Sequence, residues 1–287
     1  MRSARLAGVG ARFISVAMTV ALIAAMAVSG ASAQGKGDLV VGVTSDPDTL
    51  FPWKATQFQA VALLGLVYDS LVEFDQDLNV VPGIAESWET SDDGMAITFK
   101  IRDGISFHDG KPLTSADVKA SLDAILDEAT GAVQRTSLAS VASVEAPDES
   151  TVVLNLDNPD AGILSGLAGG ANLAILSKDD TEEGLSAAPN GTGPFAFGSR
   201  KPSESLTLVA NDAYWREGEP TLASVELRVI PDESSIVDGL RSGNVQLAVL
   251  NDPLVATAAE GDGITVTRTP QLAYHVLQLN HGRPPLD

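Results

Sequence analysis

The alternation of apolar and polar residues predicts several short strands along the chain. Ile97, Phe99 and Ile101 alternate with polar residues over 96–102, which is the pattern of a strand that buries one face. Residues 39–44 form a β-branched run that stops at a turn-rich segment, as a buried strand would. Similar runs predict strands at 151–156, 206–209, 225–230, 245–250, 264–267 and 274–279. The chain therefore has enough strands to build a sheet.

Helices are predicted where apolar residues recur at helical spacing. The clearest helix starts at Thr114, which forms a capping box with Asp117 in place of the commoner Glu. Its apolar stripe consists of Val118, Leu122, Ile125 and Leu126. Further helices are predicted at 57–68 and 235–241, the latter ending at Gly243 as a C-cap. Strands alternating with helices near the C-terminal end indicate an α/β region.

Residues 1–33 have the three-part pattern of a secretory signal peptide. Three arginines precede an apolar run over 13–28, and Ala31 and Ala33 supply the small residues of a cleavage site. We therefore expect cleavage after Ala33 and a periplasmic mature chain. A membrane anchor is the alternative, but the run is short for a bilayer. The sequence contains no cysteine that could carry a lipid, so we do not expect a lipoprotein.

The composition indicates an acidic globular protein. The chain of 287 residues has 18 Lys and Arg against 38 Asp and Glu, a net charge of −20. Hydrophobic residues make up 44% and charged residues 20%, which argues against disorder. Phosphate binding requires clustered Lys and Arg, and the sequence has no such cluster. We therefore expect no nucleic-acid partner and interpret the charge as a surface that favours solubility.

The residues needed for common catalytic and metal sites are scarce. The three histidines, His108, His275 and His281, are not at the spacing of helical metal ligands. His108 lies in a predicted Gly-flanked surface turn and is best interpreted as a structural or solvated residue. Residues 191–196 match a loose dinucleotide-binding pattern, but Pro194 lacks the N–H that would bind phosphate. We therefore expect a structural turn there, and an exported binding module without metal or cofactor. Paired carboxylates leave an exported hydrolase of peptides or saccharides as the alternative.

Five segments carry longer motifs in a characteristic order. They are LVYDSLV at 66–72, VPGIAESWE at 81–89, TFKIRDGISFHDGKPLTSADV at 98–118, GTGPF at 191–195 and NDAYW at 211–215. Together they resemble the extracellular solute-binding proteins of ABC importers, specifically the peptide/nickel-binding family 5. The resemblance spans nearly the whole chain after the signal peptide. Gln246 stands where this family usually carries an aspartate.

The resemblance implies a periplasmic-binding-protein-like α/β fold of type II, cluster C. In that fold two α/β lobes are joined by crossing strands, and an α+β subdomain is inserted in the first lobe. Carried over to this chain, the first lobe comprises 38–68 and 178–287, and the inserted subdomain comprises 69–177. The sequence stops at Asp287, where the second lobe would begin. We therefore expect that lobe to be largely absent, whether the sequence is a piece of a longer protein or the product is a fragment.

By the same resemblance, the chain is the substrate-binding component of an ABC importer. Such a protein captures a peptide or similar small solute between its lobes and delivers it to a membrane permease, and we expect a monomer that is not an enzyme. Ligands of open α/β sheets gather outside the carboxyl ends of strands. The candidate ligand-binding residues are therefore Ser45, Asp46, Asn251, Asp252, Tyr274 and His275. A non-transporting fragment of the same fold is an alternative, and the ligand is left open among dipeptides, oligopeptides, nickel complexes, opines and saccharides.

Overall fold

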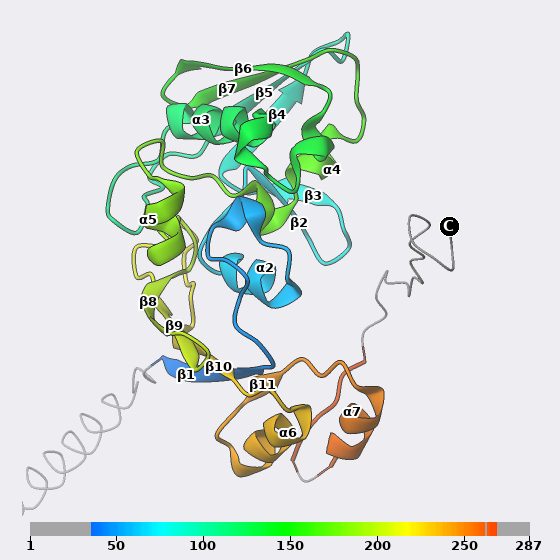
Figure 1. Ribbon diagram of the computed structural model, residues 1–287. Helices are drawn as coiled ribbons and strands as arrows, with labels where there is room; N and C mark the ends of the chain where they lie inside the picture. Colours follow the sequence, from blue (N-terminus) through cyan, green and yellow to red (C-terminus); the bar gives the residue numbers. More distant parts are fainter. Residues whose placement is uncertain (1–35, 262, 269–287) are drawn as a thin grey trace, which may run out of the picture. The chain divides into compact units, whose positions relative to one another are not determined.

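Three β-sheets and a set of short helices make up the part of the chain that the structure describes (Figure 1). This computed structural model describes residues 36–261 and 263–268. The predicted signal peptide, the predicted strand at 274–279, and the candidates Tyr274 and His275 lie outside these residues. None of the described helices has the length and hydropathy that a membrane crossing requires.

A five-stranded sheet is formed by strands from distant parts of the sequence. Its order is β11-β1-β10-β9-β8. The strands are β1 (Gly37–Val43), β8 (Phe195–Lys201), β9 (Ser205–Ala210), β10 (Leu222–Val229) and β11 (Leu247–Ala248). The predicted strands at 39–44, 206–209 and 225–230 are thereby confirmed. The strand predicted at 245–250 is only two residues long, so its pairing with β1 is confined to two positions.

A four-stranded antiparallel sheet has the order β4-β5-β7-β6. Its strands are β4 (Ala85–Thr90), β5 (Ala96–Ile101), β6 (Val141–Asp148) and β7 (Thr151–Leu156). Ile97, Phe99 and Ile101 are all buried, so the alternation in β5 has the predicted effect. The helix α3 (Ser115–Leu126) lies along this sheet, and the capping box formed by its N-cap residue is present as predicted (Figure 1).

Short elements lie between the strands of the two larger sheets. The hairpin consists of β2 (Val72–Phe74) and β3 (Val80–Pro82), and the helices are η1 (Pro52–Lys54), α2 (Phe58–Leu64), η2 (Glu128–Thr130), η3 (Arg135–Leu138), α4 (Ile163–Leu167), η4 (Gly170–Leu173) and α5 (Glu182–Ala187). The helix predicted at 57–68 is shorter than expected. It ends at Leu64 with Gly65 as its C-cap, and Leu66 and Val67 continue in tight turns whose N–H groups bond three residues back.

The helices α6 (Glu233–Ser242) and α7 (Pro253–Ala259) lie on either side of β11 in the sequence (Figure 1). The predicted α6 is confirmed, with Gly243 at a φ of 74° as its C-cap. The strand predicted at 264–267 is wrong: only an isolated bridge joins Gly261 to Ile264. Both Gly261 and Gly263 have positive φ, which turns the chain, and no described strand pairs with residues 265–267.

One continuous core links the sheets. It includes Phe99 and Leu154 of the four-stranded sheet together with Leu208 and Leu227 of the five-stranded sheet.

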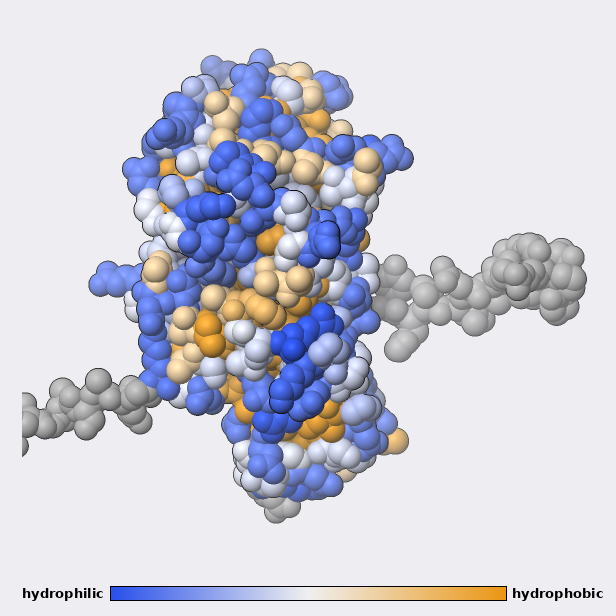
Figure 2. Space-filling view, turned by 60° about the vertical axis from the view of Figure 1, so that its left-hand side comes forward, coloured by the Kyte–Doolittle hydropathy of each residue, from blue (hydrophilic) through white to orange (hydrophobic). Residues whose placement is uncertain are grey.

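On the face shown in Figure 2, hydrophilic residues dominate and apolar residues gather toward the lower half. The subdomain boundaries expected at 68/69 and 177/178 remain a prediction.

Candidate functional site

The strands β1, β8, β10 and β11 end at the same edge of the five-stranded sheet. β11 is parallel to β1. The start of β10 contacts the start of β1 through Ser224 and Asp38, and the Ile230 N–H after β10 donates to Val43 O at 2.8 Å, so these strands are also parallel. β9 is antiparallel to both β10 and β8, which turns β8 in the same direction. The loops that follow these strands therefore leave from one edge, hereafter the carboxyl edge.

The carboxyl edge holds the described candidate residues. Ser45 and Asp46 follow β1, while Asn251 and Asp252 follow β11. Val41 is paired with Leu247, so Ser45 and Asn251 each lie four positions beyond a paired residue. The structure thus brings the two predicted loops to one edge of the sheet. Ligand contact by their side chains remains a prediction.

Asp46 connects the loop after β1 to the β8–β9 hairpin. Its Oδ2 accepts a hydrogen bond from Ser203 N at 2.6 Å and lies 3.6 Å from an Arg200 guanidinium nitrogen. Its Oδ1 is buried and has no hydrogen-bond partner within the described part of the chain. Asp46 therefore has a structural contact that the sequence analysis did not foresee, because Ser203 and Arg200 are more than 150 positions away.

Asn251 and Asp252 are held by Glu233, a residue that the sequence analysis missed. Glu233 Oε1 accepts from Asn251 N at 2.8 Å and from Asn251 Nδ2 at 3.2 Å, and Oε2 accepts from Asp252 N at 3.0 Å. Asp252 Oδ1 in turn caps α7 by accepting from Leu254 N at 2.8 Å. The only signal in the sequence was that Glu233 directly follows Asp232, the N-cap of the helix after β10.

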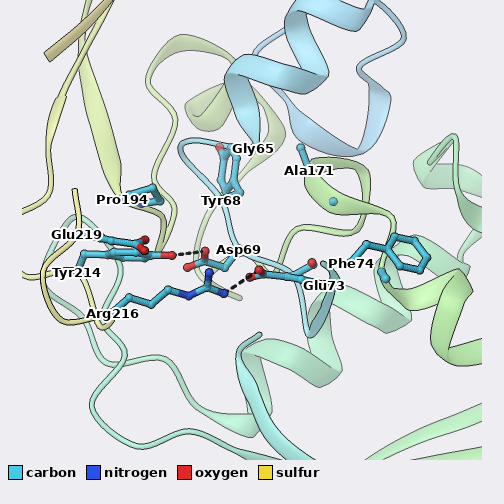
Figure 3. Close-up of a pocket in the computed structure, with 13 residues that line it drawn as sticks. Gly65, Tyr68, Asp69, Glu73, Phe74, Ala171, Pro194, Tyr214, Arg216 and Glu219 are labelled. Atoms are coloured by element: carbon cyan, nitrogen blue, oxygen red, sulfur yellow. Dashed lines mark hydrogen bonds and ion pairs between the residues drawn. The ribbon is translucent and has the colours of Figure 1, made fainter. Parts of the chain in front are cut away.

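A separate cavity of about 400 Å³ lies beside the buried carboxylate of Asp69 (Figure 3). Asp69 is 6% exposed, and its Oδ1 accepts from the Tyr214 hydroxyl at 3.1 Å. Its Oδ2 accepts from Trp215 Nε1 at 3.0 Å and from the Thr192 hydroxyl at 2.9 Å. Burial raises the pKa of Tyr214, which keeps its hydroxyl protonated as a donor. The Asp69 carboxylate is therefore satisfied by the protein itself.

Two other charged residues that line this cavity form an ion pair. Arg216 Nη2 lies 2.7 Å from Glu73 Oε2, as the dashed line in Figure 3 marks. Burial raises the pKa of Glu73, although the Arg216 guanidinium opposes that shift. The Trp215 ring has the Arg102 guanidinium 4.7 Å and the Arg216 guanidinium 4.6 Å from its centroid, within cation–π range. These contacts join segments distant in sequence. We therefore interpret the polar residues around this cavity as a cluster that stabilises the fold.

The turn at 191–195 is structural, and His108 is part of it. Gly193 N donates to Val67 O at 2.9 Å, and a Cβ on Gly191 would lie 2.0 Å from that same oxygen. The His108 ring accepts from Gly191 N through Nδ1 at 3.2 Å, and Nε2 lies 3.0 Å from Gly193 O. Because a carbonyl only accepts, the ring carries its proton on Nε2. His108, which is half-buried, therefore contacts the turn as a neutral imidazole.

This geometry predicts that His108 makes folding stability depend on pH. Burial lowers the pKa of His108 below 6.5, although the carboxylates of Asp69 and Asp109 oppose the shift. The stability contributed by neutral His108 is therefore present above about pH 6.5 and lost as pH falls through the lowered folded pKa. We expect His108→Gln to cost about 2 kcal/mol at pH 8 and less at pH 5. Urea unfolding of both proteins from pH 5 to 8 measures this difference, and a difference independent of pH would contradict the assignment.

Comparison with known proteins finds similarity to bacterial extracellular solute-binding proteins. The sequence pattern described as "Bacterial extracellular solute-binding proteins, family 5 Middle" matches residues 79–287. The glutathione-binding protein GsiB of Escherichia coli K12 is 30% identical over 282 residues, covering 96% of this chain and 55% of GsiB. The chain thus spans about half the length of the curated relatives it matches.

Solved structures show the same likeness in the fold. The oligopeptide-binding protein AppA from Bacillus subtilis, in complex with a nonapeptide, matches with a TM-score of 0.71 and 30% identity over 80% of this chain and 47% of AppA. DppA from Helicobacter pylori, in complex with the peptide STSA, matches with a TM-score of 0.66 and 29% identity over 73% of this chain and 46% of DppA. The chain belongs to family 5 of the bacterial extracellular solute-binding proteins.

Proposed function

We propose that this chain forms part of the substrate-binding component of an ABC importer, which captures a peptide or similar small solute and delivers it to a membrane permease. The observation that carries the proposal is the carboxyl edge, where the loops after β1 and β11 leave neighbouring parallel strands. This is the place where open α/β sheets bind ligands. The relatives named above, which bind glutathione or peptides, support the same function.

The proposed ligand-binding wall consists of polar residues bordered by apolar ones. Its polar members are Ser45, Asp46, Asn251 and Asp252, joined by Tyr274 and His275 from the following segment. Three large apolar side chains within four positions of Asn251 in the sequence are exposed: Leu247, Val249 and Leu254. Exposed apolar groups beside hydrogen-bonding loops suit a ligand that carries both amide groups and apolar side chains. A peptide has this chemistry.

Transport under this proposal needs no covalent step. A ligand that contacts two lobes stabilises the closed arrangement in proportion to its higher affinity for that form, and the permease then recognises the closed protein. The first lobe would comprise 38–68 and 178–287, with 69–177 as the inserted subdomain. The mature protein would act in the periplasm as a monomer, after cleavage following Ala33, without a lipid anchor or cofactor.

Calorimetric titration of the natural protein at its full length tests this function. The probes are glutathione and tri-alanine, and recovery of unchanged probe afterwards distinguishes a binder from a hydrolase. We expect Asn251→Ala and Tyr274→Ala each to weaken binding about tenfold, because a residue at the centre of a binding site contributes about 1–2 kcal/mol. The matched control is Asn155→Ala on β7, whose amide contacts Ser143 and Glu145, and it should leave the affinity unchanged. Unchanged affinity in both test variants would refute the proposed wall.

A further inference from the structure

We infer that Glu233 is a positioning residue of the ligand-binding wall and that it makes Asn251 an acceptor for N–H groups of the ligand. This inference rests on the proposed function. Glu233 is half-buried and is the first residue of α6, the helix that follows β10. Asn251 and Asp252 come from the loop after β11. Glu233 therefore connects the start of α6 to the loop after β11, at the carboxyl edge.

The contact fixes the Asn251 backbone and side chain together. Glu233 Oε1 accepts from the Asn251 main-chain N–H at 2.8 Å and from its side-chain Nδ2 at 3.2 Å. Glu233 Oε2 accepts from Asp252 N at 3.0 Å. Hydrogen bonds to a charged acceptor are stronger than neutral ones. One carboxylate thus determines the conformation of two successive residues in an exposed loop.

The same contact determines which end of the Asn251 amide is available. A carboxylate only accepts hydrogen bonds, so the amide nitrogen must face Glu233 and the amide oxygen must face away from it. Asn251 is an exposed residue, so we expect this oxygen to be accessible to a ligand. The wall therefore offers an acceptor at this position, which recognises an amide or ammonium N–H of a peptide-like ligand.

The far side of the loop is restrained as well. The Asp252 carboxylate caps α7, and Pro253 occupies the first turn of that helix. Proline disfavours the helical conformation for the residue before it, and Asp252 is accordingly extended, with a φ of −83° and a ψ of 112°. A loop held at both ends loses less conformational entropy when a ligand binds. Loss of the Glu233 contact should therefore weaken binding even where the fold is retained.

The test compares Glu233→Ala and Glu233→Gln in the natural protein at its full length. Glutathione and tri-alanine are the probes, and amide hydrogen exchange is followed at Asn251 and Asp252. We expect Glu233→Ala to weaken probe binding about tenfold and to accelerate exchange at both amides. Glu233→Gln keeps one acceptor oxygen for Asn251, so we expect about threefold weakening at most. Glu183→Ala is the control for a lost acid in the first turn of a helix, and it should change neither readout.

The outcomes separate this inference from the proposed function. If the wild-type protein binds a probe and Glu233→Ala binds it equally well, the inference is overturned while the proposed function stands. If Glu233→Ala lowers stability and affinity no more than Glu183→Ala does, the positioning role is also overturned. If the wild-type protein binds neither probe, the proposed amide-ligand function fails and the inference fails with it.

Discussion

Gly191→Ala should destabilise the protein by about 3 kcal/mol or more, and the variant is expected to express poorly in soluble form. The added Cβ would lie 2.0 Å from Val67 O and 2.7 Å from a ring carbon of Tyr68. A backbone oxygen cannot move aside as a flexible side chain can, so the turn at 191–195 and the segment at Val67 would have to separate. Urea unfolding of the soluble fraction measures the cost.

Two further glycine variants make this result interpretable. Gly193→Ala should behave similarly, because its Cβ would lie 2.6 Å from the Val67 carbonyl carbon. Gly65→Ala is the matched control: its nearest contact would be 3.4 Å, and its φ of −65° is ordinary for alanine. We expect the control to change stability by about 1 kcal/mol at most. Wild-type stability in Gly191→Ala would show that the close approach to Val67 is not required.

Asp69→Ala should cost about 3–5 kcal/mol of folding free energy. The substitution leaves the Tyr214 hydroxyl, the Trp215 indole N–H and the Thr192 hydroxyl without their common acceptor. It also removes a carboxylate that lies near the Arg216–Glu73 ion pair. Urea unfolding, followed through the fluorescence of Trp215 and the other tryptophans, measures the loss.

Asp75, an aspartate in an exposed turn, is the matched control for the stability loss expected of Asp69→Ala. Asp75 also accepts several hydrogen bonds, from Asp77 N at 2.9 Å and Asn79 N at 2.8 Å, but it lies in an exposed turn. Asp75→Ala should cost about 1 kcal/mol at most, because water can replace the lost contacts. An Asp69→Ala variant no less stable than Asp75→Ala would mean that the hydrogen bonds to buried Asp69 contribute little to folding stability.

The sequence predicted helices and strands correctly where their pattern depends only on neighbouring residues. The alternation of Ile97, Phe99 and Ile101 and the capping box at Thr114 depend on neighbouring residues alone, and both were confirmed. The strand predicted at 264–267 failed because a strand also needs a partner, and partners are not visible in a local pattern. The helix after Gln57 ended early because the Gly65 region turns to approach the 191–195 turn.

The candidate site was predictable only in part. The positions of the loops after β1 and β11 follow from strand order and the general location of ligand sites in α/β sheets. The roles of Glu233 and Arg200 could not be predicted, because their contacts join separate elements. Glu233 at the start of α6 bonds Asn251 18 positions later, and Arg200 on β8 lies beside Asp46 after β1. The burial of Asp69 was likewise hidden, since its three donors lie more than 120 positions away.

We propose that the ligand binds at the carboxyl edge of the five-stranded sheet. Hydrogen exchange of the natural protein at its full length, with and without a ligand identified by titration, tests this claim most directly. We predict slower exchange in the ligand-bound protein at residues 44–46 and 249–252, with no change around Asp69 and Arg216. Protection confined to the cavity beside Asp69, with the carboxyl edge unaffected, would contradict ligand binding at this edge.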